Sequence, residues 1–168
     1  DYPAKFGIWP ALMLFVLYTW IQDAYTKGDI PSQIATMAVV YSIITLGGMF
    51  IFGRYQWLRH GEAFSVVFGV LSRFSVTEIR VRSQDSCPVC SVDCRNLSGE
   101  CIDCYECFQR SSDRELNLRP FAIGLGRNEK VTNDILALVV LMLATVTFDG
   151  FSATPAWAEF QTFILDTF

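Results

Sequence analysis

Charged residues are scarce in this sequence, and their distribution is uneven. They make up 18% of the 168 residues, whereas a soluble domain usually has about a quarter. No residue is charged from Phe6 to Ile21, from Ile30 to Gly53 or from Ile135 to Phe148. The middle run alone exceeds the roughly 20 residues that an α-helix needs to cross a bilayer. An ordinary soluble domain would not contain three such runs.

Other absences exclude several classes of site. The chain has one histidine, so it cannot supply a histidine-rich metal site by itself. The segment "GLGRNEK" lacks the order of residues that a phosphate-binding loop needs. Basic residues are interspersed with acidic ones, so we expect no nucleic-acid partner. No basic region precedes a small-residue cleavage site, so no signal peptide is expected.

The uncharged runs predict an all-α, polytopic transmembrane protein with about three spans, near residues 6–22, 32–53 and 134–157. Aromatic rings, which prefer the bilayer interface, flank the first run. The alternative is a soluble protein with unusually long buried helices. The chain ends on the apolar run "FQTFILDTF", which is too short to span. We therefore expect a piece of a longer protein, whose partners are the lipid bilayer and further transmembrane helices of the same chain or of other subunits.

A shorter apolar segment, "GEAFSVVFGVLSRF", runs from Gly61 to Phe74. Its length suits a re-entrant or interfacial helix better than a span. If it crossed the membrane instead, everything after it would change sides. The sequence thus predicts four parts: two spans in 1–58, this helix in 59–80, a Cys-rich loop module in 81–130, and the third span with the start of a further segment in 131–168.

The basic residues predict an orientation. Of the 13 Lys and Arg residues, only Lys27 lies between the first two predicted spans, while eleven lie between the second and the third. Because loops rich in Lys and Arg stay in the cytoplasm, we expect the long loop to be cytoplasmic.

All six cysteines lie in that loop, with the spacing C-x2-C-x3-C-x6-C-x2-C-x2-C: Cys87, Cys90, Cys94, Cys101, Cys104 and Cys107. A C-x2-C pair can present two thiolates to one tetrahedral ion, and four sulfurs close a structural zinc site. Zinc suits a reducing cytoplasm. Three disulfides are the alternative if the loop faces an oxidising compartment. An iron–sulfur cluster is a further alternative, because "CIDCYEC" contains a ferredoxin-like C-x2-C-x2-C run but lacks the fourth Cys-Pro.

Three polar residues near the predicted spans are candidates for chemistry. His60 and Glu62 lie in "RHGE" at the end of the second span, where they either bind a proton or metal or anchor a helix end. Asp149 lies in "TFDGFSATPAW". An acidic residue inside a span usually marks an ion path, but Asp149 would also be tolerated close to the far interface.

The segments "FGRYQWLRHGEAFSVVFGVLSRFSVTE", "ELNLRPFAIGL" and "FDGFSATPAW" resemble prokaryotic polytopic membrane proteins labelled fenitrothion hydrolase-like. The resemblance covers most of residues 6–157. It implies an integral protein of a prokaryotic cell membrane with more helices than this chain has, and the label implies organophosphate hydrolysis.

The sequence therefore predicts part of a transporter or permease-like membrane protein with a zinc-binding Cys loop. One alternative is a membrane-bound hydrolase in which His60, Glu62 and Asp149 converge on a substrate. Another is a subunit whose Cys loop docks a partner or transfers electrons.

Overall fold

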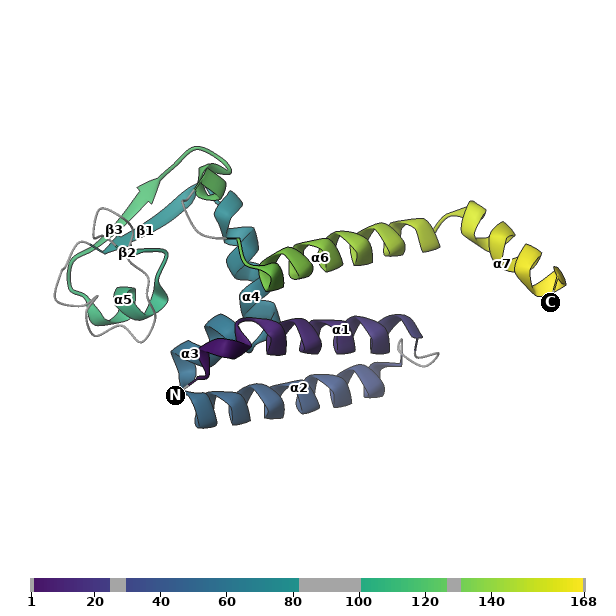
Figure 1. Cartoon of the computed structure of the whole chain (residues 1–168), viewed down its shortest axis with the longest axis horizontal. Helices are drawn as coiled ribbons and strands as arrows, with labels where there is room; N and C mark the ends of the chain where they lie inside the picture. The colour runs from purple at the N-terminus through teal and green to yellow at the C-terminus, as the bar shows by residue number, and fades with distance from the viewer. Residues whose placement is uncertain (1, 25–29, 82–100, 127–130, 168) are drawn as a thin grey trace. The chain divides into compact units, whose positions relative to one another are not determined.

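The structure of the chain is a computed structural model that describes residues 2–24, 30–81, 101–126 and 131–167. Most of these residues are helical, which confirms the predicted helical class in its coarse form. The chain divides into two compact units, Asp1–Lys130 and Val131–Phe168. Figure 1 shows the elements of each unit in chain order.

The first unit begins with helices that are almost continuous in sequence. These helices are η1 (Ala4–Phe6), α1 (Trp9–Ala24), α2 (Pro31–Phe52), α3 (Arg54–His60), α4 (Ala63–Leu71) and η2 (Ser72–Phe74). Pro31 occupies the first turn of α2, where its missing N–H costs nothing. The helix ends at Gly53, whose φ of 84° is readily accessible only to glycine. This residue lets the chain leave α2 and start α3 immediately.

Among the described residues, two helices are long and apolar enough to cross a membrane: α2, and α6 (Asn133–Ser152) in the second unit. The helix within the first predicted span, α1, is apolar but shorter, so the expectation of about three spans is not confirmed. Of the 22 residues of α2, all of which the structure describes, Gly48 alone is buried. The apolar surface of α2 is thus left almost entirely uncovered by the described residues.

The Cys-rich region is not simply a loop, because it contains a sheet that the sequence analysis did not predict. β1 (Thr77–Val81) pairs antiparallel with β2 (Cys101–Ile102) on one side and with β3 (Arg114–Leu118) on the other. The short helix α5 (Tyr105–Arg110) packs against β1, and the turn η4 (Ile123–Gly126) packs against η2. We call β1, β2, β3, α5 and η4 the sheet module (Figure 1).

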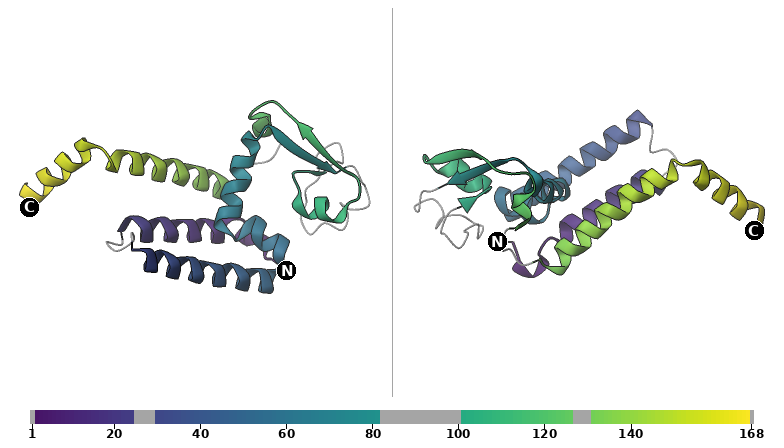
Figure 2. Two further views of the ribbon diagram at one scale, coloured as in Figure 1. Left: turned by 180° about the vertical axis from the view of Figure 1, so that it is seen from behind. Right: turned by 90° about the horizontal axis from the view of Figure 1, so that it is seen from above.

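The second unit consists of α6 followed by α7 (Pro155–Thr167), and Figure 2 shows the bend between them. The third predicted span was placed to residue 157, but the helix ends at Ser152. Pro155 has no N–H to donate to a preceding turn, so it starts a new helix instead of continuing the old one. Trp157 in the first turn of α7 packs edge-on against Phe148 and Phe151 of α6.

Candidate functional site

A tryptophan fixes α3 against α2. The Trp57 ring is buried and stacks on Phe52, with 5.6 Å between ring centroids. A Cβ added at Gly48 would lie 2.1 Å from this ring, and one added at Gly61 would lie 2.4 Å from it. The indole therefore occupies space that two glycines leave open. Since Gly48 lies on α2 and Gly61 follows α3, α3 folds back along α2.

This fold-back brings Glu62 to the side of α2. The Glu62 side chain is 5% exposed, and its Oε1 accepts a hydrogen bond from the hydroxyl of Tyr41. The same carboxylate caps the N-terminus of α4, because Oε1 accepts from Phe64 N at 3.1 Å and Oε2 from Ser65 N at 2.5 Å. Glu62 thus connects α2 to the start of α4.

Aromatic rings enclose this contact. Phe64 packs edge-on against Tyr41 of α2, with 5.3 Å between centroids, and against Tyr18 of α1, with 5.4 Å. Three helices, α1, α2 and α4, therefore meet around Phe64. The Tyr41–Glu62 hydrogen bond lies directly beside these apolar rings.

The position of Tyr41 along α2 gives the depth of the contact. Tyr41 precedes Phe52 by eleven residues, which is about 16 Å at 1.5 Å per residue. The 22 residues of α2 extend about 33 Å in total. Glu62 therefore lies about half-way along a helix that carries no charged residue.

Two further polar atoms belong to the same region. Thr45 lies one helical turn after Tyr41, and its Oγ1 is buried without a hydrogen-bond partner in the part of the chain that the structure describes. The same holds for Nε1 of Trp57. Buried polar atoms of this kind usually have an ordered water or ion as their partner. The side of α2 that contacts Trp57 and Glu62 thus combines the Glu62 carboxylate, the hydroxyls of Tyr41 and Thr45, and the indole N–H of Trp57.

Of the three candidates for chemistry, only Glu62 takes part in this arrangement. His60 is two residues away, but its ring stacks on Tyr2 at 5.2 Å and its Nδ1 lies 3.1 Å from the Gln56 carbonyl of its own helix. Asp149 is exposed, near the end of α6 in the other unit. Convergence of all three on one substrate remains a prediction.

Three of the six cysteines are described, and the structure brings them together. Cys101, Cys104 and Cys107 form a small buried core with Val81 of β1, and Phe108 packs against it. The sulfurs of Cys101 and Cys107 lie 3.6 Å apart. The other three, Cys87, Cys90 and Cys94, lie outside the described residues.

The positions of these three cysteines can be compared with the geometry of zinc sites and of disulfides. Two sulfurs at about 2.3 Å from one tetrahedral zinc would lie about 3.8 Å apart, which is close to the distance between Cys101 and Cys107. No group of three or more His, Cys, Asp or Glu side chains in the described part of the chain has the arrangement of a metal site. No disulfide joins two of the three described cysteines. Zinc, three disulfides and an iron–sulfur cluster all remain predictions.

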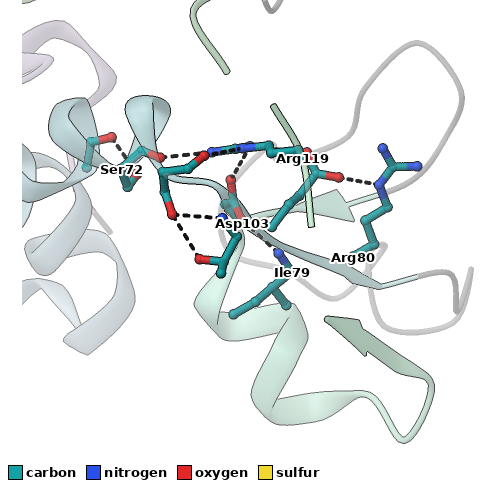
Figure 3. A network of polar contacts seen from close by, with 9 residues as sticks. Ser72, Ile79, Arg80, Asp103 and Arg119 are labelled. Atoms are coloured by element: carbon teal, nitrogen blue, oxygen red, sulfur yellow. Dashed lines mark hydrogen bonds and ion pairs between the residues drawn. The ribbon is translucent and has the colours of Figure 1, made fainter. Parts of the chain in front are cut away.

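A buried arginine ties the sheet module to the helices (Figure 3). Nη1 of Arg119 contacts Glu78 of β1 at 3.1 Å and Asp103 at 3.2 Å. Its Nε donates to the Ser75 carbonyl at 2.9 Å, and its Nη2 to the Ser72 carbonyl at 2.8 Å. One side chain therefore connects η2, β1 and the residue after β2.

The charge on Glu78 depends on its two arginines. Burial by itself raises the pKa of the Glu78 carboxyl, but the hydrogen bonds and positive charges of Arg80 and Arg119 outweigh it. They hold the pKa of Glu78 below its usual value, so the carboxylate is ionised at neutral pH. Arg119 accordingly has a fully charged partner within the module.

The sequence analysis missed Tyr41 and Arg119. Tyr41 could have been found, because tyrosines in spans prefer the interface and this one lies in the middle of an uncharged run. Arg119 lies in the quoted segment "ELNLRPFAIGL", but its partners are 16 to 47 residues away in sequence, and no local pattern indicates them.

No known protein family, curated protein or solved structure matches this chain. The resemblance to fenitrothion hydrolase-like proteins therefore remains a prediction.

Proposed function

We propose that this chain is part of a polytopic integral membrane protein, transporter or permease-like, in which α2 and α6 span the bilayer. In this proposal the predicted re-entrant segment from Gly61 to Phe74, which contains α4, returns through the bilayer, and Glu62 and Tyr41 line a path for protons. The single observation that carries the proposal is the hydrogen bond between Tyr41 and Glu62, half-way along a helix of membrane-spanning length.

The placement of Glu62 supports this function on energetic grounds. An ionisable side chain at the depth of the hydrocarbon core is costly, and such residues mark ion paths and proton relays. A chain of O–H groups can pass a proton, and the hydroxyls of Tyr41 and Thr45 lie one turn apart on the face of α2 that Glu62 contacts. The buried atoms without partners on this face are where bound waters would extend the relay.

Proton flux into liposomes tests the proposal. The full chain is reconstituted into vesicles that contain a pH-sensitive dye, and a potassium diffusion potential drives protons inward. We expect dye acidification with the unmodified chain and a loss of it in Tyr41→Phe. This change removes one hydroxyl but keeps the ring that packs on Phe64 and the carboxylate that caps α4.

Tyr18→Phe is the matched control, because the Tyr18 ring also packs on Phe64 but does not contact Glu62 in the structure. We expect this variant to conduct like the unmodified chain. Equal flux in Tyr41→Phe and Tyr18→Phe would contradict the proposed path. Flux no greater than in protein-free vesicles would contradict the transporter proposal itself.

A further inference from the structure

The sheet module has one polar face and one apolar face. In the paired register of β1 and β3, Glu78 is opposite Asn117 and Arg80 is opposite Glu115, so these four share a face. The other face carries Thr77, Ile79 and Val81 from β1 together with Arg114, Leu116 and Leu118 from β3. A sheet with this alternation needs a cover for its apolar face.

In the part of the chain that the structure describes, only one end of the apolar face is covered. Val81 and Cys101 lie under α5, in the core with Cys104 and Cys107. At the other end Leu116 is 73% exposed and Leu118 is 85% exposed. Nothing in the described part of the chain lies over these two leucines. The internal core of the module therefore stops half-way along the strands.

Aromatic and aliphatic residues enlarge the open end. Phe74 precedes β1, Phe121 follows β3, and their rings lie 5.9 Å apart. Because Thr77 pairs with Leu118, this ring pair lies at the same end of the strands. Phe121 is 71% exposed and Ile123 in η4 is 55% exposed. We call Phe74, Leu116, Leu118, Phe121 and Ile123 the apolar strip.

We propose that the apolar strip docks on the lipid bilayer surface, so that the sheet module lies on the membrane with its polar face toward water. The inference rests on the proposed function, namely that α2 lies in a bilayer. The strip continues along the chain from Phe68 and Leu71, which are exposed on α4. It also has the composition of a bilayer interface, because Phe74 is next to Arg73, whose charge can contact anionic headgroups.

Two features favour lipid over a second copy of this chain. The module is flanked in sequence by the two helices of spanning length, since α2 ends at Phe52 and α6 begins seven residues after η4. Because the module is attached to helices that are proposed to lie in the bilayer, the strip stays close to the lipid surface and meets lipid more often than it meets a second copy of the chain. The exposed edge strand β3 is short and begins with Arg114 and Glu115, and charged side chains on a short edge oppose strand pairing between copies.

Methyl NMR of the full chain in nanodiscs tests the inference. The chain carries labelled leucine and isoleucine methyl groups, and two paramagnetic reagents are added separately: a lipid with a nitroxide near its headgroup end, and a water-soluble gadolinium chelate. Leu46, exposed on α2, reports whether that helix lies in the bilayer. Ile102 is the control within the module, because it is opposite Arg80 and so lies on the polar face.

We expect the lipid reagent to broaden Leu116 and Leu118, and the chelate to broaden Ile102 but not these two leucines. If Leu46 responds to lipid while Leu116 and Leu118 respond to the chelate, the strip faces water; the inference fails and the proposed function survives. If neither reagent reaches the two leucines, protein covers the strip and the inference also fails. If Leu46 itself does not respond to lipid, the proposed function fails first.

Discussion

The fold-back of α3 onto α2 can be tested with two adjacent glycines. At Gly48 an added Cβ would lie 2.1 Å from Cε2 of Trp57, whereas at Gly47 it would meet nothing within 4 Å. Gly48→Ala therefore forces the indole to move, and overpacking of this kind costs about 1–3 kcal/mol. Gly47→Ala only removes a helix-interior glycine, which stabilises a helix by about 0.8–1.0 kcal/mol.

Gly48→Ala gains the same helix propensity, so the two variants should differ by the overpacking cost alone, about 1–3 kcal/mol in free energy of unfolding, with Gly48→Ala the less stable. Unfolding of the detergent-solubilised chain by increasing amounts of sodium dodecyl sulfate, followed by circular dichroism, measures both. Tryptophan fluorescence would also shift in Gly48→Ala if Trp57 leaves its buried position. If Gly48→Ala is as stable as Gly47→Ala, Trp57 does not pack on α2, and the placement of Glu62 beside Tyr41 loses its support.

Three further predictions concern the sheet module. Arg119→Met should destabilise the module by up to about 3–5 kcal/mol, because it removes the buried one of the two arginines that pair with the Glu78 carboxylate and leaves the more exposed Arg80. Hydrogen exchange of β1 amides measures this loss, and addition of Glu78→Gln should restore part of it. The lowered pKa of Glu78 means that its stabilisation is present above pH 4.5 and is lost as the pH falls through the lower folded value. The protection factors of the same amides, which correct for the intrinsic pH dependence of exchange, should therefore fall in acid. Glu78→Gln should abolish that dependence, and an unchanged dependence would contradict the prediction. Finally, the zinc prediction requires one or two zinc ions per chain and six thiols that react under denaturing conditions, while no metal and no reactive thiols would mean three disulfides, which elemental analysis with a thiol count decides.

The helices were largely predictable because their signal is local. The span predicted at 32–53 corresponds to α2 at Pro31–Phe52. Both ends of α2 follow from single residues. Pro31 favours the start of a helix, and Gly53 allows the backbone to turn away from it. The third span was predicted to end at residue 157, five residues after α6 ends at Ser152, because it was extended past Pro155.

The sheet was not predictable in the same way. Its strands are two to five residues long, and β1 and β3 are separated by more than thirty residues. The alternation in "RELNL" is visible in the sequence, but five residues are too few to distinguish a strand from a loop. The close approach of the cysteines was implied by their spacing, whereas the fact that Val81 completes their core depends on pairing between distant segments.

The segment from Glu62 to Ser75 is held at both ends, and this links the two proposals. At its start the Glu62 carboxylate caps α4 and accepts the hydroxyl of Tyr41, so α4 can begin only where α3 has folded back on α2. At its end Arg119 holds the carbonyls of Ser72 and Ser75 and pairs with Glu78 of the sheet. Each anchor is a buried charged group with several hydrogen bonds, and the hydrogen bonds of such a network strengthen one another. Protonation of Glu62 would weaken the cap on α4. Because α4 continues directly into η2, a movement of α4 would be passed to η2. The contacts between Arg119 and η2 are therefore the first contacts of the sheet module that protonation of Glu62 would disturb.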